Sequence, residues 1–295
     1  MKRIVYTIAI GKPKFAECAL GLGRSLRLIG DETERIVITD QPDYPWLKSF
    51  DKVIKPVEPF EWTMLSKLSA LDRTDADQVL FIDSDCLAFQ RLDTIFDYCQ
   101  GKGLCVQGKA ISSGDWYGNV EGHLKKHGVD WLPQFNGGMI YYERTPQCQK
   151  MIQLCYELAR GAKDSGFGYE SALIPEEPYV AVAIAKEGVD QNGNAHLIPD
   201  TKDFTNSATG LIGKLKLDVM ANQCEYVCRR FDVKFVRPIL FHASRYNIYA
   251  TYWKQIDRLR ALEEYESKHP FGYMSPIQKL ERSINRRYLK WIRKK

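Results

Sequence analysis

Two aspartates that directly follow an apolar run are the residues of this sequence best suited to bind a metal ion. The run Val79–Ile82 has the length of a strand and leads into Asp83, Ser84 and Asp85. In an open α/β sheet, ligands bind beyond the carboxyl ends of the strands, where we expect these two carboxylates. Hard divalent cations prefer carboxylate oxygen and share their coordination with substrate phosphates. The motif therefore predicts Mn²⁺ or Mg²⁺ that clamps a diphosphate and, as a Lewis acid, stabilises its departure.

A second Asp-x-Asp sequence in the same chain shows why position matters. Asp75, Ala76 and Asp77 precede the apolar run, at the end of the strand where ligands are not expected. We interpret this copy as a solvated turn. The copy at Asp83 differs because a buried strand leads into it, and its alternative interpretation is a capped loop without function.

Strands and helices alternate along the chain, as an α/β sheet requires. Apolar runs rich in β-formers cover Ile4–Ile10, Arg35–Thr39 and Gln78–Ile82, and helical spacing covers Phe15–Ile29, which ends at Gly30. This alternation predicts βαβ units and a mostly parallel sheet. Further along, we expect helices at Ser66–Leu71, Pro146–Arg160 and Pro178–Lys186, and strands at Gly103–Val106, Met139–Tyr142, Ala195–Ile198 and Lys234–Phe241.

The N-terminus and the cysteines favour a protein inside the cell. The first apolar run resembles a signal peptide, but it is short, and Gly11–Pro13 offers no small-residue cleavage site. The eight cysteines are scattered without a C-x-x-C pair, which suits reduced thiols and argues against a zinc site. Cys224 and Cys228 could share a helical face, but without nearby partners we expect half-buried thiols there. We expect His123 and His127 to lie on a solvated helix.

Several short motifs, in order, resemble glycosyltransferase family 8 and its glycogenin-like relatives. Leu65–Phe89 looks like the core of that family, with a basic helix residue before an apolar strand that ends in Asp-x-Asp. Phe135–Met139 resembles the family's Phe-Asn-Ser-Gly segment, and His242 resembles its C-terminal metal-binding histidine. Val5–Ile8 resembles its first strand. The resemblance covers about residues 1–250. It implies the GT-A fold, a single mixed, mostly parallel sheet flanked by helices.

The resemblance assigns the metal ligands. It implies that Asp85 binds the metal directly, that Asp83 reaches the metal or the ribose, and that His242 binds through a neutral ring nitrogen. Ser84, between the two aspartates, is expected at the donor. The alternative for His242 is a hydrogen-bonded histidine at the edge of the core.

The resemblance also assigns residues to the nucleotide sugar. Lys67 matches the basic residue that contacts the donor, although most helix lysines are only solvated. Thr7 and Ile8 would line the nucleoside pocket mainly through backbone groups, or else only pack in their strand. Gly137 and Gly138 permit close backbone approach. Asn136, beside these glycines, offers an amide for sugar hydroxyls, and the alternative for this segment is a turn before a strand.

Two segments depart from the family pattern. After its histidine the family carries a glycine and then a lysine that contacts the diphosphate, but here Ala243 and Ser244 follow, and Arg245 could supply the charge. The family's acidic-glutamine segment is altered to two glutamates between prolines. We favour Glu177 over Glu176 as a general base or a contact for the acceptor hydroxyl. The alternative is an ordinary helix N-terminus, where acids favour the dipole.

The C-terminal segment 274–295 carries the basic charge of the protein. It holds eight basic residues and one acid, whereas the whole chain has a net charge of +5, so the remainder is slightly acidic. Its apolar residues at helical spacing predict a helix that binds an anionic membrane surface, or one that packs on the body or on a second subunit. Nucleic acid is not expected as a partner, because no such motif is present. The apolar positions are Ile277, Leu280, Ile284, Tyr288 and Trp291.

These observations predict a GT-A domain over residues 1–250, followed by a helical extension over residues 251–295. We expect a metal-dependent glycosyltransferase that moves a sugar from a nucleotide-diphosphate donor, a UDP-sugar, to a saccharide or lipid-linked acceptor with retention. We expect it in the cytoplasm, peripheral on the membrane face. One alternative is a non-catalytic protein of the same fold that binds nucleotide sugars or membranes. The other is a sugar-phosphate nucleotidyltransferase, whose Gly-rich basic loop is poorly matched by Gly11–Lys14.

Overall fold

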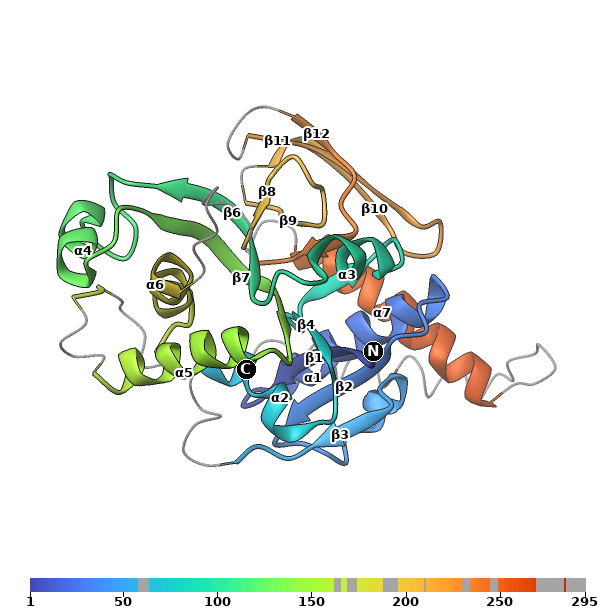
Figure 1. Cartoon of the computed structure of the whole chain (residues 1–295). Helices are drawn as coiled ribbons and strands as arrows, with labels where there is room; N and C mark the ends of the chain where they lie inside the picture. Colours follow the sequence, from blue (N-terminus) through green and yellow to red (C-terminus); the bar gives the residue numbers. More distant parts are fainter. Residues whose placement is uncertain are drawn as a thin grey trace. The chain divides into compact units, whose positions relative to one another are not determined.

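The chain folds into two compact units, each assembled from several segments. The computed structural model describes residues 1–57, 64–161, 166–168, 174–187, 196–209, 211–229, 234–244, 249–268 and Ile284 (Figure 1). The first unit comprises Met1–Thr7, Pro56–Asp83 and Leu92–Thr205. The second unit comprises Ile8–Lys55, Ser84–Arg91 and Asn206–Lys295. The Asp-x-Asp motif contains one boundary, since Asp83 ends a segment of the first unit and Ser84 begins a segment of the second.

The first unit is built on a mixed sheet. Its strands follow the order β1, β4, β7, β6 and β8. β1 pairs with β4 and β6 pairs with β8 in parallel, whereas β7 is antiparallel to both of its neighbours. Every residue of β4 is buried, so its end delivers the aspartate motif from the interior. The strands are β1 (Arg3–Ala9), β4 (Gln78–Ile82), β6 (Cys105–Ile111), β7 (Leu132–Glu143) and β8 (Leu197–Pro199).

A bulge in β7 interrupts this sheet beside the end of β4. Val106 of β6 pairs with Ile140, but Gly108, two residues later, pairs with Phe135. Residues 136–139 of β7 therefore have no partners on β6, and the carbonyl of Gly138 instead accepts a hydrogen bond from Asp83 N at 2.9 Å. Bulges of this kind re-aim backbone and side-chain groups next to functional sites. The segment that sequence patterning predicted as a turn or a site is an interruption within a long strand.

Helices surround the sheet of the first unit and position its polar residues. α5 begins at a Thr145 cap, whose hydroxyl accepts from Cys148 N at 3.2 Å, and α4 begins at Asn119, which caps Gly122 N at 2.7 Å. α6 is buried along Pro178–Ala185, and it packs on β7 and α5 (Figure 1). The helices are η3 (Met64–Leu68), α2 (Ala70–Arg73), α3 (Asp93–Cys99), α4 (Val120–His127), α5 (Pro146–Arg160) and α6 (Glu177–Glu187).

The second unit combines a parallel strand pair with two small antiparallel sheets. β2 pairs in parallel with β3, one sheet has the order β5, β13, β9, and the other has the order β10, β11, β12. The elements are α1 (Pro13–Leu28), β2 (Glu34–Thr39), η1 (Pro45–Ser49), β3 (Lys52–Ile54), β5 (Cys86–Ala88), β9 (Thr205–Ser207), β10 (Leu211–Asp218), β11 (Gln223–Cys228), β12 (Lys234–Val236), β13 (Leu240–His242) and α7 (Tyr249–Lys268).

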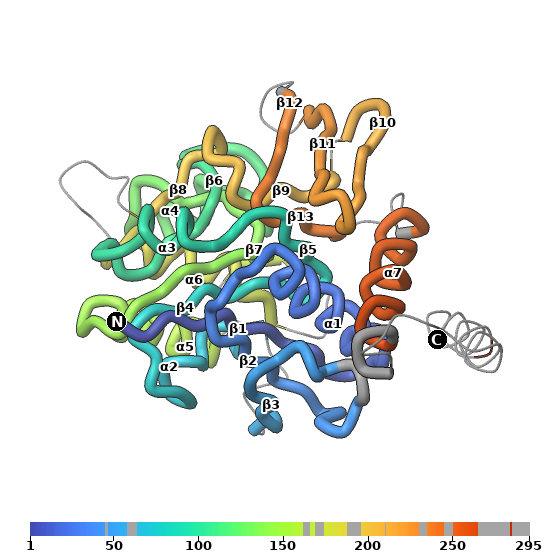
Figure 2. The backbone as a smooth tube through the Cα atoms, turned by 90° about the vertical axis from the view of Figure 1, so that its right-hand side faces the viewer, coloured from blue at the N-terminus to red at the C-terminus, as the bar shows by residue number. Residues whose placement is uncertain are grey.

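Two buried ion pairs fasten the C-terminal helix α7 to α1, and the two helices lie side by side (Figure 2). Arg260 Nη2 lies 2.6 Å from Glu17 Oε2, and Arg24 Nε lies 3.1 Å from Glu263 Oε2. The side chains of Glu17 and Arg260 are almost fully buried. Each charge therefore requires its partner, because an unpaired buried charge costs several kcal/mol.

Several sequence expectations need correction. Cys224 and Cys228 lie on strand β11 and are buried, so they share no helical face. His123 lies on helix α4 as expected, but it is buried against Phe167 rather than solvated. The expected strand at Lys234–Phe241 is divided into β12 and β13, and the expected helix at Ser66–Leu71 is the 3-10 turn η3 followed by α2. Local patterning also missed α3 and the β10–β11 hairpin.

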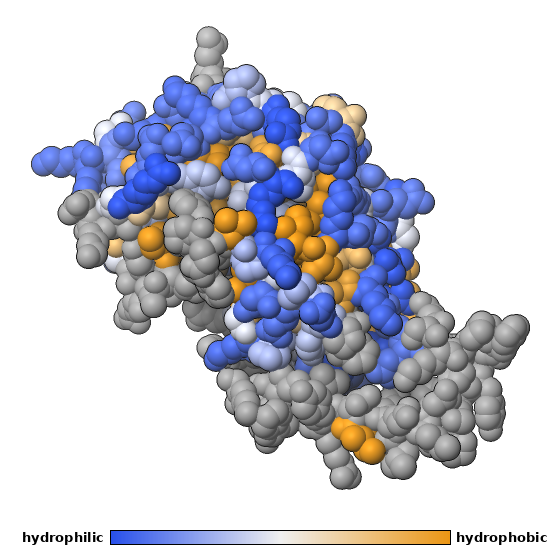
Figure 3. Space-filling view, turned by 90° about the horizontal axis from the view of Figure 1, so that it is seen from below, coloured by the Kyte–Doolittle hydropathy of each residue, from blue (hydrophilic) through white to orange (hydrophobic). Residues whose placement is uncertain are grey.

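The face of the protein shown in Figure 3 carries many hydrophilic side chains among its described residues. On the face shown in Figure 3, apolar side chains are visible between polar ones, which is ordinary for a folded protein. No helix among the described residues is both long and apolar enough to cross a lipid bilayer. The segment 274–295 lies outside the described residues except for Ile284, which is helical and 58% exposed, so its membrane contact stays a prediction.

Candidate active site

A buried ammonium group organises the polar centre of the first unit. Lys67 Nζ lies 2.7 Å from Glu176 Oε1 and 2.9 Å from Asp83 Oδ1, and it donates to the carbonyl of Gly137 at 3.0 Å. Lys67 lies on η3, and its partners come from the end of β4, the β7 bulge and the residue before α6. The side chain of Lys67 is only 8% exposed. Its three N–H donors therefore have three acceptors within the protein.

The adjacent glutamate is fixed by two neutral donors. Glu177 Oε1 accepts from Gly137 N at 2.7 Å, and its Oε2 accepts from the Tyr117 hydroxyl at 2.9 Å. Tyr117 has a φ of 56°, in the left-handed region that non-glycine residues rarely adopt. Its carbonyl accepts from Gly168 N at 2.7 Å and lies 3.1 Å from His123 Nε2. Such conformations persist where surrounding contacts impose them, and they cluster at functional sites.

The buried ionisable groups of this cluster shift one another's pKa values. Burial, opposed by the charge of Lys67 and reinforced by that of Glu177, raises the pKa of Glu176 to about 7. Burial also raises the pKa of Glu177, while the hydrogen bond from Gly137 N lowers it. Burial lowers the pKa of Lys67, but Asp83 and Glu176 more than offset this and hold it above its ordinary value. The cluster therefore holds a proton near neutral pH that is shared among its carboxyls.

Protein stability is expected to fall between about pH 5 and about pH 8, and to fall less in Glu176→Gln. The folded pKa of about 7 lies above the ordinary value of 4.5, so in this window the folded state keeps a proton that the unfolded state has released. Raising the pH removes that proton and costs stability. Urea unfolding of both proteins at both pH values measures the difference, and equal pH slopes would contradict the assignment.

Gly137→Ala is expected to lower the free energy of unfolding by about 1–3 kcal/mol, as overpacking does. An added Cβ would lie 1.8 Å from Glu176 Oε1 and 3.3 Å from Lys67 Nζ. Glu176 cannot rotate away without breaking its ion pair. The matched control is Gly161→Ala, where the nearest atom would be 3.7 Å away and little change is expected. Urea denaturation measures the free energy of unfolding of both variants. Equal values would show that the cluster accommodates the added methyl group without strain.

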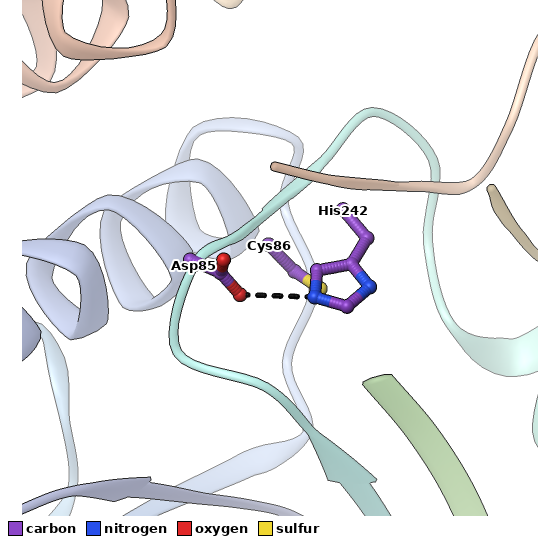
Figure 4. Close-up of side chains that lie close together, drawn as sticks. All are labelled: Asp85, Cys86 and His242. Carbon is purple, nitrogen blue, oxygen red and sulfur yellow. Dashed lines mark ion pairs between the residues drawn. The ribbon is translucent and has the colours of Figure 1, made fainter. Parts of the chain in front are cut away.

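A second group of candidate ligands lies in the second unit, where β5 pairs with β13. His242 Nε2 lies 3.2 Å from Asp85 Oδ1, and the two side chains point toward each other (Figure 4). The backbone fixes this approach, because His242 is the register partner of Cys86 and Ala243 N donates to the carbonyl of Asp85 at 3.2 Å. The side chain of His242 is 5% exposed, whereas that of Asp85 is 24% exposed. A carboxylate oxygen and an imidazole nitrogen at this distance fit a shared divalent cation.

Solved structures similar to this chain are glycosyltransferases. The galactosyltransferase LgtC, in complex with donor and acceptor sugar analogues, is 14% identical with a TM-score of 0.52, covering 90% of this chain and 100% of LgtC. The glycosyltransferase GlyE of Streptococcus pneumoniae TIGR4 is 14% identical with a TM-score of 0.54, covering 93% of this chain and 66% of GlyE. The fold is GT-A. No protein-family model matches the sequence, and no curated protein matches it.

Within the GT-A fold, the expected site residues fall into two groups. Lys67, Asp83, Gly137 and Glu177 meet in the first unit, and Asp85 and His242 meet in the second. The roles assigned to them stay predictions.

The remaining expected residues lie near these groups or outside the described chain. Asn136 Oδ1 accepts from Gly138 N at 3.1 Å, so this amide oxygen stabilises the bulge. The side chain of Thr7 is fully buried, which agrees with packing, while Ile8 is half-buried and Ser84 is buried. Arg245 lies outside the described residues.

Sequence reasoning gave little weight to three residues of these two groups. Glu176 was placed behind Glu177, yet it contacts Lys67 directly. Tyr117 carried no signal except the glycines near it, and its contact with Glu177 spans 60 residues of sequence. Cys86 directly follows the Asp-x-Asp motif, but only strand pairing reveals that it faces His242.

Proposed function

We propose that this chain transfers a sugar from a nucleotide-diphosphate donor, UDP-linked, to an acceptor hydroxyl in a metal-dependent reaction. One observation carries the proposal. In a chain with the GT-A fold, the aspartate motif that follows β4 places Asp85 in contact with His242. The resemblance of the sequence motifs to glycosyltransferase family 8 supports the same activity. It also supports retention of configuration, which the NMR coupling constant of the product's anomeric proton would check.

The metal site of the second unit is proposed to contain Asp85 and His242. Asp83 precedes Asp85 by two residues, and both carboxylates suit Mn²⁺ or Mg²⁺. A bound cation would neutralise charge on the departing nucleoside diphosphate. The side chain of Asp85 is 24% exposed, so a cation in solution can reach this carboxylate.

Lys67 is proposed to position Asp83 and Glu176 rather than to contact the donor itself. Its ammonium already donates to two carboxylates and a carbonyl, and it also lies 5.1 Å from the ring centroid of Phe81. A direct donor contact would require the loss of one of these partners. This assignment refines the role that the family resemblance implies for the residue.

Glu177 is proposed to receive a hydrogen bond from the acceptor hydroxyl. An ionised carboxylate can accept about four hydrogen bonds. Glu177 accepts only two within the described residues, one from Gly137 N on Oε1 and one from the Tyr117 hydroxyl on Oε2. The two donors therefore orient the carboxylate while leaving capacity for a substrate. The acceptor is proposed to be a saccharide or a lipid-linked saccharide.

A thermal-shift screen tests the donor part of the proposal. Nucleoside diphosphates and their sugars are added to the full chain with and without Mn²⁺. A ligand that binds only the folded state must raise the melting temperature. We expect a Mn²⁺-dependent rise with uridine compounds, and its absence for every nucleotide would contradict the proposal. A rise without donor hydrolysis or transfer would instead indicate a non-catalytic nucleotide-sugar-binding protein.

A further inference from the structure

We propose that Cys86 is a metal ligand, so that Asp85, Cys86 and His242 form a three-donor site that prefers a borderline divalent cation such as Zn²⁺ or Co²⁺ to Mg²⁺. The site belongs to the second unit and requires neither a nucleotide nor an acceptor. Its metal binding can therefore be tested apart from sugar transfer.

Strand pairing brings the three donors together. Cys86 and His242 are direct register partners in the antiparallel β5–β13 pair, so their side chains leave the same face of that sheet. Asp85 precedes β5, and its backbone carbonyl accepts from Ala243 N. One ligand atom from each of the three residues lies within 4.8 Å of the other two. In Figure 4 the Cys86 sulfur lies beside the imidazole nitrogen that faces Asp85.

These separations fit a tetrahedral ion. Zinc–oxygen and zinc–nitrogen bonds of about 2.0 Å and zinc–sulfur bonds of about 2.3 Å place ligand atoms roughly 3.3–3.8 Å apart. The 3.2 Å between Asp85 Oδ1 and His242 Nε2 already matches this spacing. The third donor atom, the sulfur of Cys86, lies within 4.8 Å of both. Three protein ligands leave a fourth position for water or a phosphate oxygen, as in catalytic zinc sites.

The mixed donor set determines the preference among cations. Mg²⁺ favours oxygen ligands in octahedral geometry, whereas thiolate and imidazole suit zinc and cobalt. All eight cysteines are buried and none is in a disulfide, but among the described residues only Cys86 belongs to a three-donor cluster. The scattered cysteines of the sequence argued against a zinc site. That argument considered only the spacing of the cysteines along the chain. It did not consider that His242, the third donor, comes from a strand distant in the sequence.

Cobalt absorption tests the thiolate ligand. The metal-free full-length protein is titrated with Co²⁺, and we expect one equivalent to produce a near-ultraviolet thiolate-to-cobalt charge-transfer band. Cys86→Ser should lose this band and bind Co²⁺ at least about tenfold more weakly, the lower end of the losses seen when even an outer-shell partner is removed. The matched control is Cys18→Ser, because Cys18 is also a buried thiol of the second unit, and the band should persist there.

A measurement on the unmodified protein covers the case in which Cys86→Ser does not fold. X-ray absorption at the zinc edge should show one sulfur scatterer at about 2.3 Å together with nitrogen or oxygen at about 2.0 Å. A shell of nitrogen and oxygen alone would overturn the proposal while leaving the Asp85–His242 metal site intact. A sulfur shell without nucleotide binding would support it even if the glycosyltransferase proposal failed.

Discussion

Asp85→Ala is expected to abolish the Mn²⁺-dependent rise in melting temperature and to slow sugar transfer by roughly 10²–10³, the range seen when one electrostatic stabiliser of a transition state is removed. Asp85 supplies the only carboxylate in the cluster with His242 among the described residues. Without it the imidazole cannot hold a hard cation against a diphosphate. The shift assay measures ligand binding, and product formation from a radiolabelled donor measures the rate.

The chain provides its own control for Asp85→Ala. Asp75 belongs to the other Asp-x-Asp copy, its side chain is 76% exposed, and it forms an ion pair with Lys2. Asp75→Ala should therefore leave both the shift and the rate unchanged. A retained Mn²⁺ effect in Asp85→Ala would place the metal elsewhere. Asp85→Asn preserves the shape of the side chain, so it shows whether the effects of Asp85→Ala come from the lost charge or from a folding defect.

Lys67→Met is expected to lower the free energy of unfolding by about 3–5 kcal/mol at neutral pH, because it leaves buried carboxylates without their counter-charge. The side chain of Glu176 is only 4% exposed, so it cannot be resolvated in place. The unpaired charge of Asp83 contributes less to this loss of stability, because its side chain is 27% exposed and therefore partly solvated. The loss should shrink at acidic pH, where Glu176 is protonated. Urea denaturation followed by circular dichroism measures it.

A double variant separates charge from packing at Lys67. Lys67→Met combined with Glu176→Gln removes both members of the closest ion pair, so it should recover part of the stability lost in Lys67→Met. A loss below about 1 kcal/mol in the single variant would mean that the carboxyls stay protonated in the folded state and need no counter-charge. Equal losses in the single and double variants would assign the effect to packing.

Local patterning was accurate where a segment is stabilised by its own residues. The expected helix at Pro146–Arg160 is α5, and the expected strand at Gln78–Ile82 is β4. α5 has helical apolar periodicity, β4 is a continuous apolar run, and both have clear boundary residues. The β10–β11 hairpin was missed because its alternation is broken by a register shift between Ile212 and Lys216. The three residues of β5 were missed because so short a strand exists only through its pairing with β13.

The sequence by itself determined the α/β class, the aspartates at the end of β4 and the order of the motifs through His242, since each depends on residues close together in the chain. Only the tertiary structure decided how the polar groups combine. The Lys67–Glu176 contact spans 109 residues of sequence, and the neighbourhood of Cys86 and His242 depends on the pairing of two three-residue strands. The physical reason is that periodicity records which face of a segment is buried, whereas a buried ion pair or a shared ligand set depends on which distant segment covers that face.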